Sequence, residues 1–198
     1  MNIVLATRNR KKVEELMRMF AGYSIVFQTV DAFPGCPEVI EDGRSFRQNA
    51  VKKAVAIARY TGCLALADDS GLEVDALDGA PGVYSARYAG KDASDGDNVK
   101  KLLKDMMGID DPVSRTARFV CCIALALPDG RSKTFTGHVK GTIGKRPKGH
   151  NGFGYDPVFY PQGHERTFAE MEDTEKDDMS HRGRAMKKLY AYLKEMLD

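Results

Sequence analysis

The run Leu66-Ala67-Asp68-Asp69-Ser70-Gly71-Leu72 holds the side chains best suited to chemistry in this sequence. A short apolar strand is expected to end at Asp68 and Asp69, so that two carboxylates lie at the rim of a sheet where a loop opens to solvent. Adjacent carboxylates raise each other's pKa unless a cation lies between them. Hard oxygen ligands of this kind suit Mg²⁺. The alternative interpretation is an acidic surface turn.

A basic segment follows the first expected strand and leads into the first expected helix. Its residues are Thr7, Arg8, Asn9, Arg10, Lys11 and Lys12. The free N–H groups and the dipole of a helix N-terminus favour an anion, and the added cations favour a phosphate group. The spacing differs from that of a Walker P-loop. A solvated basic helix turn is the alternative.

Two later segments carry polar residues that a ligand could use. Asn49 and Lys53 are four residues apart on a helix expected to begin after Ser45, so they share one face. Arg87 lies in a loop between two tyrosines. A polar helix surface and an ordinary surface arginine are the alternative interpretations.

The segment Gly152 to Pro157 arranges aromatic rings around a glycine. Phe153 and Tyr155 flank Gly154, whose small size allows a close approach of the backbone. Two such rings can stack on a flat heterocycle, and Asp156 offers it a hydrogen-bond acceptor. A tight turn with buried aromatic rings is the alternative.

Cations gather near the start of the last expected helix. Lys176 precedes this helix, and His181 and Arg182 fall in its first turn after Ser180. Positive charge at a helix N-terminus opposes the helix dipole, so a bound ligand would explain it. A frayed, exposed turn is the alternative. His181 has no second His or Cys at ligand spacing, so we do not expect it to bind a metal.

The elements that must position these residues indicate an α/β fold. Strands are expected at residues 2–6, 25–30, 72–76, 115–127 and 131–143 and in the run that leads into Asp68 and Asp69, and helices at residues 9–20, 45–62, 94–107 and 180–197. Asp129-Gly130 predicts a hairpin between the last two strands. The length and the absence of repeats or linkers predict one domain over residues 1–198, with a mixed sheet flanked by helices in two lobes.

Composition narrows the class of protein. The net charge of +2 does not favour nucleic acid as a partner, and the hydrophobic content of 42% fits a globular domain. None of the four cysteines forms a C-x-x-C pair, and Cys121-Cys122 in an apolar run favours a reducing, cytoplasmic location. The chain begins at once with a strand-like run, so no signal peptide is expected. The apolar run Phe119–Leu127 is too short for a membrane-spanning helix.

Taken together and in this order, the segments resemble the inosine triphosphate pyrophosphatase family over essentially the whole chain. The matching segments are Thr7-x-Asn9-x-x-Lys12, Ser45-Phe46-x-x-Asn49-Ala50-x-x-Lys53-Ala54, Asp68-Asp69-Ser70-Gly71-Leu72, Gly79-Ala80-Pro81-Gly82-Val83-Tyr84-Ser85-Ala86-Arg87, Gly152-Phe153-Gly154-Tyr155-Asp156-Pro157 and Ser180-His181-Arg182-Gly183. The resemblance implies Mg²⁺-dependent hydrolysis of ITP, dITP and XTP to the monophosphate and pyrophosphate. It also implies a homodimer and an elongated mixed α/β fold with a central substrate cleft between two lobes.

The resemblance assigns a role to each group of residues. Asp69 would be the general base and a metal ligand, and Asp68 beside it would be a further metal ligand. Glu41 would be a further metal ligand, with Glu38 as the rival choice. The triphosphate would be bound by Thr7, Arg8, Asn9, Arg10, Lys11, Lys12, Lys53 and Arg87. Ser70 would contact the substrate, and the base and sugar would be bound by Phe153, Gly154, Tyr155, Asp156, Lys176, His181 and Arg182.

These roles imply a mechanism and a preference among bases. Asp69 would activate a water that attacks the α-phosphorus in line, and pyrophosphate would leave. Lys176 and Arg182 are pure hydrogen-bond donors, so they would favour the 6-oxo group of hypoxanthine and xanthine over the 6-amino group of adenine. This argument does not exclude GTP.

Two other functions remain open from the sequence. A non-catalytic nucleotide- or RNA-binding protein could use the basic loops and the aromatic turn, but it would not need Asp68 and Asp69 beside a phosphate site. Such a protein would bind without divalent ions. A pyrophosphatase for modified pyrimidine nucleotides is the other alternative, and a panel of bases would distinguish it.

Overall fold

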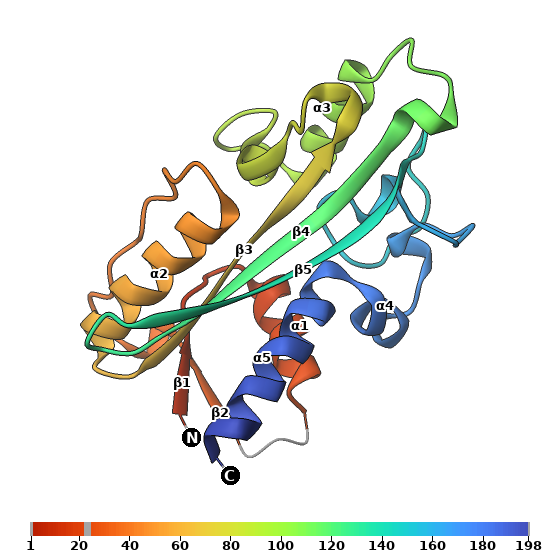
Figure 1. The fold of residues 1–198 in the computed structure, drawn as a ribbon. Coiled ribbons are helices and arrows are strands. Elements are labelled where there is room, and N and C mark those ends of the chain that lie inside the picture. The colour runs from red at the N-terminus through yellow and green to blue at the C-terminus, as the bar shows by residue number, and fades with distance from the viewer. Residues whose placement is uncertain (1, 22–24, 198) are drawn as a thin grey trace. The chain divides into compact units, whose positions relative to one another are not determined.

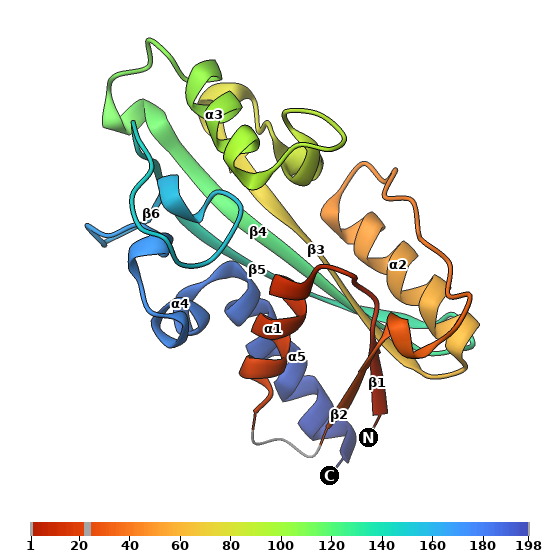
Figure 2. The ribbon, with the colours of Figure 1, turned by 180° about the vertical axis from the view of Figure 1, so that it is seen from behind.

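The computed structural model describes residues 2–21 and 25–197 and has a mixed sheet, as the sequence predicts. Within these residues the strand order is β2-β1-β3-β4-β5-β6 (Figures 1 and 2). The strands are β1 (Asn2–Leu5), β2 (Val26–Thr29), β3 (Leu64–Val74), β4 (Thr116–Ala126), β5 (Ser132–Ile143) and β6 (Phe159–Pro161). β1 pairs in parallel with β2 and β3, whereas β5 and β6 are antiparallel.

Capping residues define the starts of the longer helices. The helices are α1 (Arg10–Met19), α2 (Phe46–Thr61), α3 (Asp95–Asp105), α4 (Asp173–Met179) and α5 (His181–Leu197). The side chains of Asn9, Ser45 and Ser94 accept hydrogen bonds from backbone N–H groups in the first turns of α1, α2 and α3. Gly62 closes α2 in the left-handed conformation that favours glycine. The predicted long helices are therefore confirmed.

The chain divides into two compact units. The first contains Met1–Asp69, Cys121–Thr136 and Ala185–Asp198, and the second contains Ser70–Val120 and Gly137–Arg184. Strands β3, β4 and β5 each contribute residues to both units. The single domain over residues 1–198 stays a prediction.

The first unit has helices on both sides of its strands. α1 and α5 share one hydrophobic cluster with β1, β3 and β4, which includes Leu16, Leu189, Leu66 and Ile123. α2 lies on the opposite side of β3 (Figure 2). Because side chains alternate along a strand, residues 65, 67 and 69 of β3 face α2, while residues 66 and 68 face α1.

The second unit has its own core. Buried residues of β3, β4, α3 and the segment from β6 to the turn at residues 168–170 pack together in one cluster. Aromatic rings dominate its centre: Phe119 and Phe159 meet edge to face with centroids 4.7 Å apart, and Phe168 lies 5.3 Å from Phe159. This core supports the loops that carry the aromatic turn and the last basic residues.

β3 corrects one prediction about the acidic run. The sequence predicts that the strand ends at Asp68 and Asp69 and that a second strand follows, but β3 continues unbroken from Leu64 to Val74. Both carboxylates are buried, at 1% and 5% exposure, and do not lie at a sheet rim. The strand can continue because a helix on each side supplies the carboxylates with partners.

Short elements were missed. β6 has three residues and α4 has seven, too few for either to show a hydrophobic period. The predicted hairpin is confirmed, since Leu127 N–H donates to the Arg131 carbonyl beside the turn at Gly130. No helix among the described residues is long and apolar enough to cross a membrane.

Candidate active site

The loop between β1 and α1 begins the polar cluster of the first unit. The Asn9 side chain caps α1 by accepting from Lys12 N–H at 3.2 Å, and Asn9 N–H donates to Thr7 Oγ1 at 3.2 Å. Arg8 donates to the Cys36 carbonyl at 3.0 Å, which ties this loop to the segment before α2. Arg10 and its neighbour Lys11 lie exposed at the start of α1. The loop thus places a helix N-terminus next to several cations, an arrangement that favours an anion.

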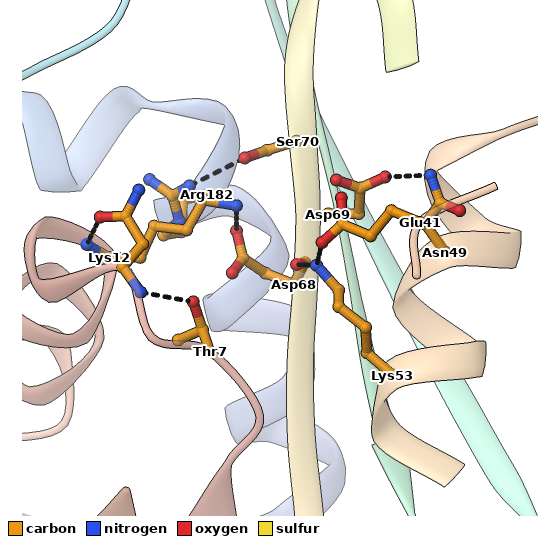
Figure 3. Close-up of polar contacts among 10 residues, drawn as sticks. Thr7, Lys12, Glu41, Asn49, Lys53, Asp68, Asp69, Ser70 and Arg182 are labelled. Atoms are coloured by element: carbon orange, nitrogen blue, oxygen red, sulfur yellow. Dashed lines mark hydrogen bonds and ion pairs between the residues drawn. The ribbon is translucent and has the colours of Figure 1, made fainter. Parts of the chain in front are cut away.

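Asp68 faces this loop. Its carboxylate lies 3.1 Å from Lys12 Nζ, with the Asp68 side chain fully buried (Figure 3). Its backbone carbonyl accepts from Lys53 Nζ at 2.7 Å. Asp68 therefore joins a lysine of α1 to a lysine of α2.

Asp69 points to the other side of β3, toward α2 (Figure 3). Its Oδ2 accepts from Asn49 Nδ2 at 2.9 Å, and Asn49 is completely buried. The structure therefore does not bring the Asp68 and Asp69 carboxylates together, because adjacent residues of a strand project to opposite faces. Each carboxylate has a different set of neighbours.

Glu41 approaches from the loop before α2. Its Oε1 accepts from Lys53 Nζ at 2.6 Å, and its side chain is about one-third exposed. Burial alone would lower the pKa of Lys53, but the carboxylates of Asp68, Glu41 and Asp69 raise it, so the ammonium remains charged. Glu38, the rival choice, is exposed.

The electrostatics of Asp69 suit a proton acceptor. Burial raises the pKa of Asp69 above its ordinary value, and the Glu41 carboxylate adds to this effect. The cations Lys53 and Lys12 oppose this rise in pKa without reversing it. A carboxylate with a raised pKa takes a proton more readily near neutral pH.

The donor set also fits a divalent ion. Glu41 and Asp69 are hard oxygen donors, close enough for the one charge to raise the pKa of the other. A divalent cation would relieve this repulsion. Among the described residues, no three His, Cys, Asp or Glu side chains form a ready-made metal site. Mg²⁺ fits such a pair, because it binds through one or two carboxylates and completes its shell with phosphates and water.

The second unit holds the remaining predicted residues. Arg182, only 1% exposed, donates to Ser70 Oγ at 2.9 Å. Its guanidinium carbon lies 5.5 Å from the centre of the Phe153 ring. The start of α5 and the aromatic turn therefore meet at a buried arginine that can donate hydrogen bonds beside an aromatic face.

A buried ion pair fixes the aromatic turn. Lys176 Nζ lies 2.7 Å from Asp156 Oδ2, and both side chains are almost fully buried. The same oxygen accepts from Phe153 N–H at 2.8 Å. A Cβ at Gly152 would collide with this oxygen, so the turn requires a glycine there. Lys176 lies 5.0 Å from the Phe153 ring centre.

Other predicted residues of the second unit have aromatic or backbone partners. His181 stacks on Phe119 with ring centroids 4.6 Å apart and an interplanar angle of 9°. Tyr155 Oη donates to the Ser85 carbonyl at 2.8 Å, and burial raises the pKa of its phenol. The Arg87 guanidinium lies 5.2 Å from the ring centre of an exposed tyrosine in the same turn.

Sequence reasoning missed three residues of these clusters. The sequence places Asn49 on the same helix face as Lys53 but assigns it no role at the site, although this spacing is the signal that it reaches β3. Asp95, at the start of α3, accepts from Gly154 N–H at 2.9 Å. Phe119 lies under His181. No local pattern indicates the last two, since their partners lie far away in sequence.

The chain is similar to curated proteins over almost its full length. It is 51% identical over 198 residues to the dITP/XTP pyrophosphatase of Desulforamulus reducens, covering 99% of this chain and 97% of that protein. It is 48% identical to the dITP/XTP pyrophosphatase of Syntrophobacter fumaroxidans, covering 98% of this chain and 83% of that protein.

Solved structures share its fold. A HAM1 protein from Coxiella burnetii superposes with a TM-score of 0.90 at 42% identity, covering 98% of this chain and 99% of that one. The dITP/XTP pyrophosphatase of Mycobacterium abscessus gives a TM-score of 0.77 at 45% identity, covering 96% and 97%. The model of the Ham1 family matches residues 3–192. The family model and these relatives match almost the whole chain. The chain therefore belongs to the Ham1 family.

Proposed function

We propose that this chain is a Mg²⁺-dependent pyrophosphatase that hydrolyses dITP, ITP and XTP to the nucleoside monophosphate and pyrophosphate. The relatives named dITP/XTP pyrophosphatase support the reaction and the substrate class. One observation carries the assignment of the chemistry: the buried Asp69 carboxylate accepts a hydrogen bond from Asn49, and burial and the Glu41 carboxylate raise its pKa. Such a hydrolase would remove deaminated purines from the nucleotide pool.

The catalytic step follows from these side chains. Asp69 accepts a proton from a water molecule, and the oxygen of that water forms a bond to the α-phosphorus. The bond from the α-phosphorus to the bridging oxygen breaks, and that oxygen leaves with pyrophosphate. Lys12, Lys53 and the N-terminus of α1 stabilise the negative charge that moves onto the leaving group.

Glu41 and Asp69 are the side chains that would hold Mg²⁺. When bound, the ion neutralises phosphate charge and favours deprotonation of water. Asp68 has a different task in this account: its carboxylate orients Lys12 on the face of β3 away from α2. This division follows from the opposite directions of the two neighbouring carboxylates (Figure 3).

The base preference rests on donors in the second unit. Lys176 and Arg182 carry only donors, and Phe153 offers an aromatic face near both. A 6-oxo purine presents an acceptor to such groups, whereas adenine presents an amino donor. Asp156 forms an ion pair with Lys176 and accepts a hydrogen bond from Phe153 N–H, and these two contacts fix the conformation of the aromatic turn.

Product analysis tests this function. Phosphorus NMR of ITP incubated with the protein and Mg²⁺ should detect IMP and pyrophosphate. IDP with inorganic phosphate would instead indicate attack at the γ-phosphorus and would contradict the proposal. Divalent-independent binding without any product would favour the nucleotide-binding alternative.

Two further features belong to the same proposal. A homodimer is expected from the family, and light scattering coupled to size-exclusion chromatography would give a mass near twice 21.9 kDa. Cys121 and Cys122 are adjacent and buried in β4, which fits action in a reducing compartment such as the cytoplasm.

A further inference from the structure

Asn49 has a pair of hydrogen bonds that link the catalytic carboxylate to the loop carrying Glu41. Its Nδ2 donates to Asp69 Oδ2 at 2.9 Å, and its Oδ1 accepts from Gly43 N–H at 2.7 Å. The side chain is completely buried in the first turn of α2 (Figure 3). A buried amide with both ends bonded has one fixed orientation.

The backbone bond determines what the amide can offer to Asp69. The N–H of Gly43 can only donate, so the amide oxygen must face it. The amide nitrogen must then face Asp69, and it can only donate. The carboxylate oxygen is thus fixed as an acceptor at a defined position, which an aspartate or an alanine at this position could not achieve.

The close contact between the loop and Asn49 depends on the glycine at position 43. A Cβ added to Gly43 would lie 2.6 Å from Asn49 Oδ1 and 2.9 Å from Gln48 Cβ, so only glycine allows the close approach without displacement. Glu41 lies two residues earlier and forms its own ion pair with Lys53, one turn along α2. One helix therefore anchors both the loop of Glu41 and the carboxylate of Asp69.

We propose that Asn49 is a positioning residue that fixes Asp69 and the Glu41 loop relative to each other. This inference rests on the proposed function, since it assigns Asn49 to the catalytic carboxylate. Partners of metal-binding carboxylates set their orientation, and loss of such a partner typically reduces activity or metal affinity by about 10- to 100-fold. Asn49 acts through Asp69 and does not need to touch the substrate.

Gln48 provides a matched control. It is the neighbouring residue of α2, its Oε1 accepts from Arg44 N–H at 2.7 Å, and its side chain is exposed. Gln48→Ala therefore removes a bond of the same type to the same loop without altering the amide that faces Asp69. The comparison separates positioning of the carboxylate from general anchoring of the loop.

The experiment measures kcat and KM for ITP at saturating Mg²⁺, and Mn²⁺ binding to the nucleotide-free protein by titration. Asn49→Ala should lower kcat by about 10- to 100-fold and weaken Mn²⁺ binding, while KM changes by less than about threefold. Gln48→Ala should leave all three values within about twofold of wild type. Thermal unfolding shows that each variant is folded.

Two more variants keep the test decisive if Asn49→Ala does not fold. Asn49→Asp preserves the shape and the acceptor for Gly43 but cannot donate to Asp69, so kcat should still fall. Gly43→Ala retains Asn49 and displaces its amide, so kcat should fall there too. A kcat near wild type in any of these folded variants, or an equal loss in Gln48→Ala, would overturn the inference. Failure of wild type itself to release pyrophosphate would instead reject the proposed function, and Mn²⁺ binding would still test the positioning role.

Discussion

Asp68 and Asp69 are neighbours in β3, yet their side chains have different partners on opposite faces of the strand. Sequence reasoning could identify both residues, because an apolar run leads directly into two adjacent carboxylates. It could not assign their separate directions, since it expected the strand to end there. The direction of a side chain follows from strand continuity, which depends on partners that are distant in sequence.

Asp69→Asn should remove activity without loss of stability. The pKa of Asp69 is raised in the folded state, so its ionised form is less favourable there than in the unfolded chain. Stability from this group is present at low pH and is lost as pH rises through the folded-state pKa. At pH 7 the amide of the Asp69→Asn variant removes the cost of burying a charged carboxylate, and its oxygen can still accept the hydrogen bond from Asn49.

For Asp69→Asn we expect kcat to fall by several decades while the free energy of unfolding, measured in guanidinium chloride, stays equal or increases. Near-normal turnover would contradict the base assignment.

Asp68→Asn should lower the stability of the protein more than Asp69→Asn does, and should lower kcat less. Its carboxylate is fully buried against Lys12, whose side chain is 15% exposed. Removal of one partner of a buried ion pair typically costs about 3–5 kcal/mol, and here some solvent access to Lys12 reduces that figure. We expect a clear loss of unfolding free energy at pH 7, with a smaller loss of kcat than in Asp69→Asn. Equal effects of the two variants on both measurements would contradict their separate roles.

At the scale of elements, caps and turns made the long segments predictable. Ser45 and Gly62 delimit α2, Ser94 begins α3, and the hairpin turn joins β4 to β5 as expected. These signals are local, so the sequence contains them. α4 and β6 could not be predicted, because they are short and their stability comes from contacts with distant segments.

The junction of α4 and α5 offers a test at this scale. A Cβ at Gly183, in the first turn of α5, would collide with the Asp177 carbonyl of α4. Gly183→Ala must therefore separate these helices, which carry Lys176 and Arg182. We expect a destabilisation of about 1–3 kcal/mol and a higher KM for ITP. Both are measurable by chemical unfolding and steady-state kinetics.

Gly96→Ala is the matched control for that substitution. Gly96 lies in α3, and a Cβ there would meet only Ser94 Oγ, at 3.7 Å. Alanine is favoured over glycine inside a helix, so this variant should gain about 0.5–1 kcal/mol and keep its KM. A Gly183→Ala variant that behaves like Gly96→Ala would contradict the close approach of α4 and α5.

At the scale of the whole molecule, the fold class and the family were predictable from ordered segments that extend over the entire chain. The division into two compact units was harder to predict from the sequence, because β3, β4 and β5 each contribute residues to both units. No composition boundary in the sequence marks such a division. Asp69, which we propose as the general base, and the residues proposed to bind the base belong to different units, although Asp69 and Ser70 are adjacent in the chain.

We propose that this chain hydrolyses ITP, dITP and XTP in a reaction that needs a divalent ion. The most direct test measures pyrophosphate release from ITP, XTP, GTP and ATP, each with and without Mg²⁺. We expect fast, Mg²⁺-dependent release from ITP and XTP, and slow release from GTP and ATP. Release that is equal for ITP and ATP would contradict the base preference, and no release from any nucleotide would contradict the assignment of Asp69 as the general base.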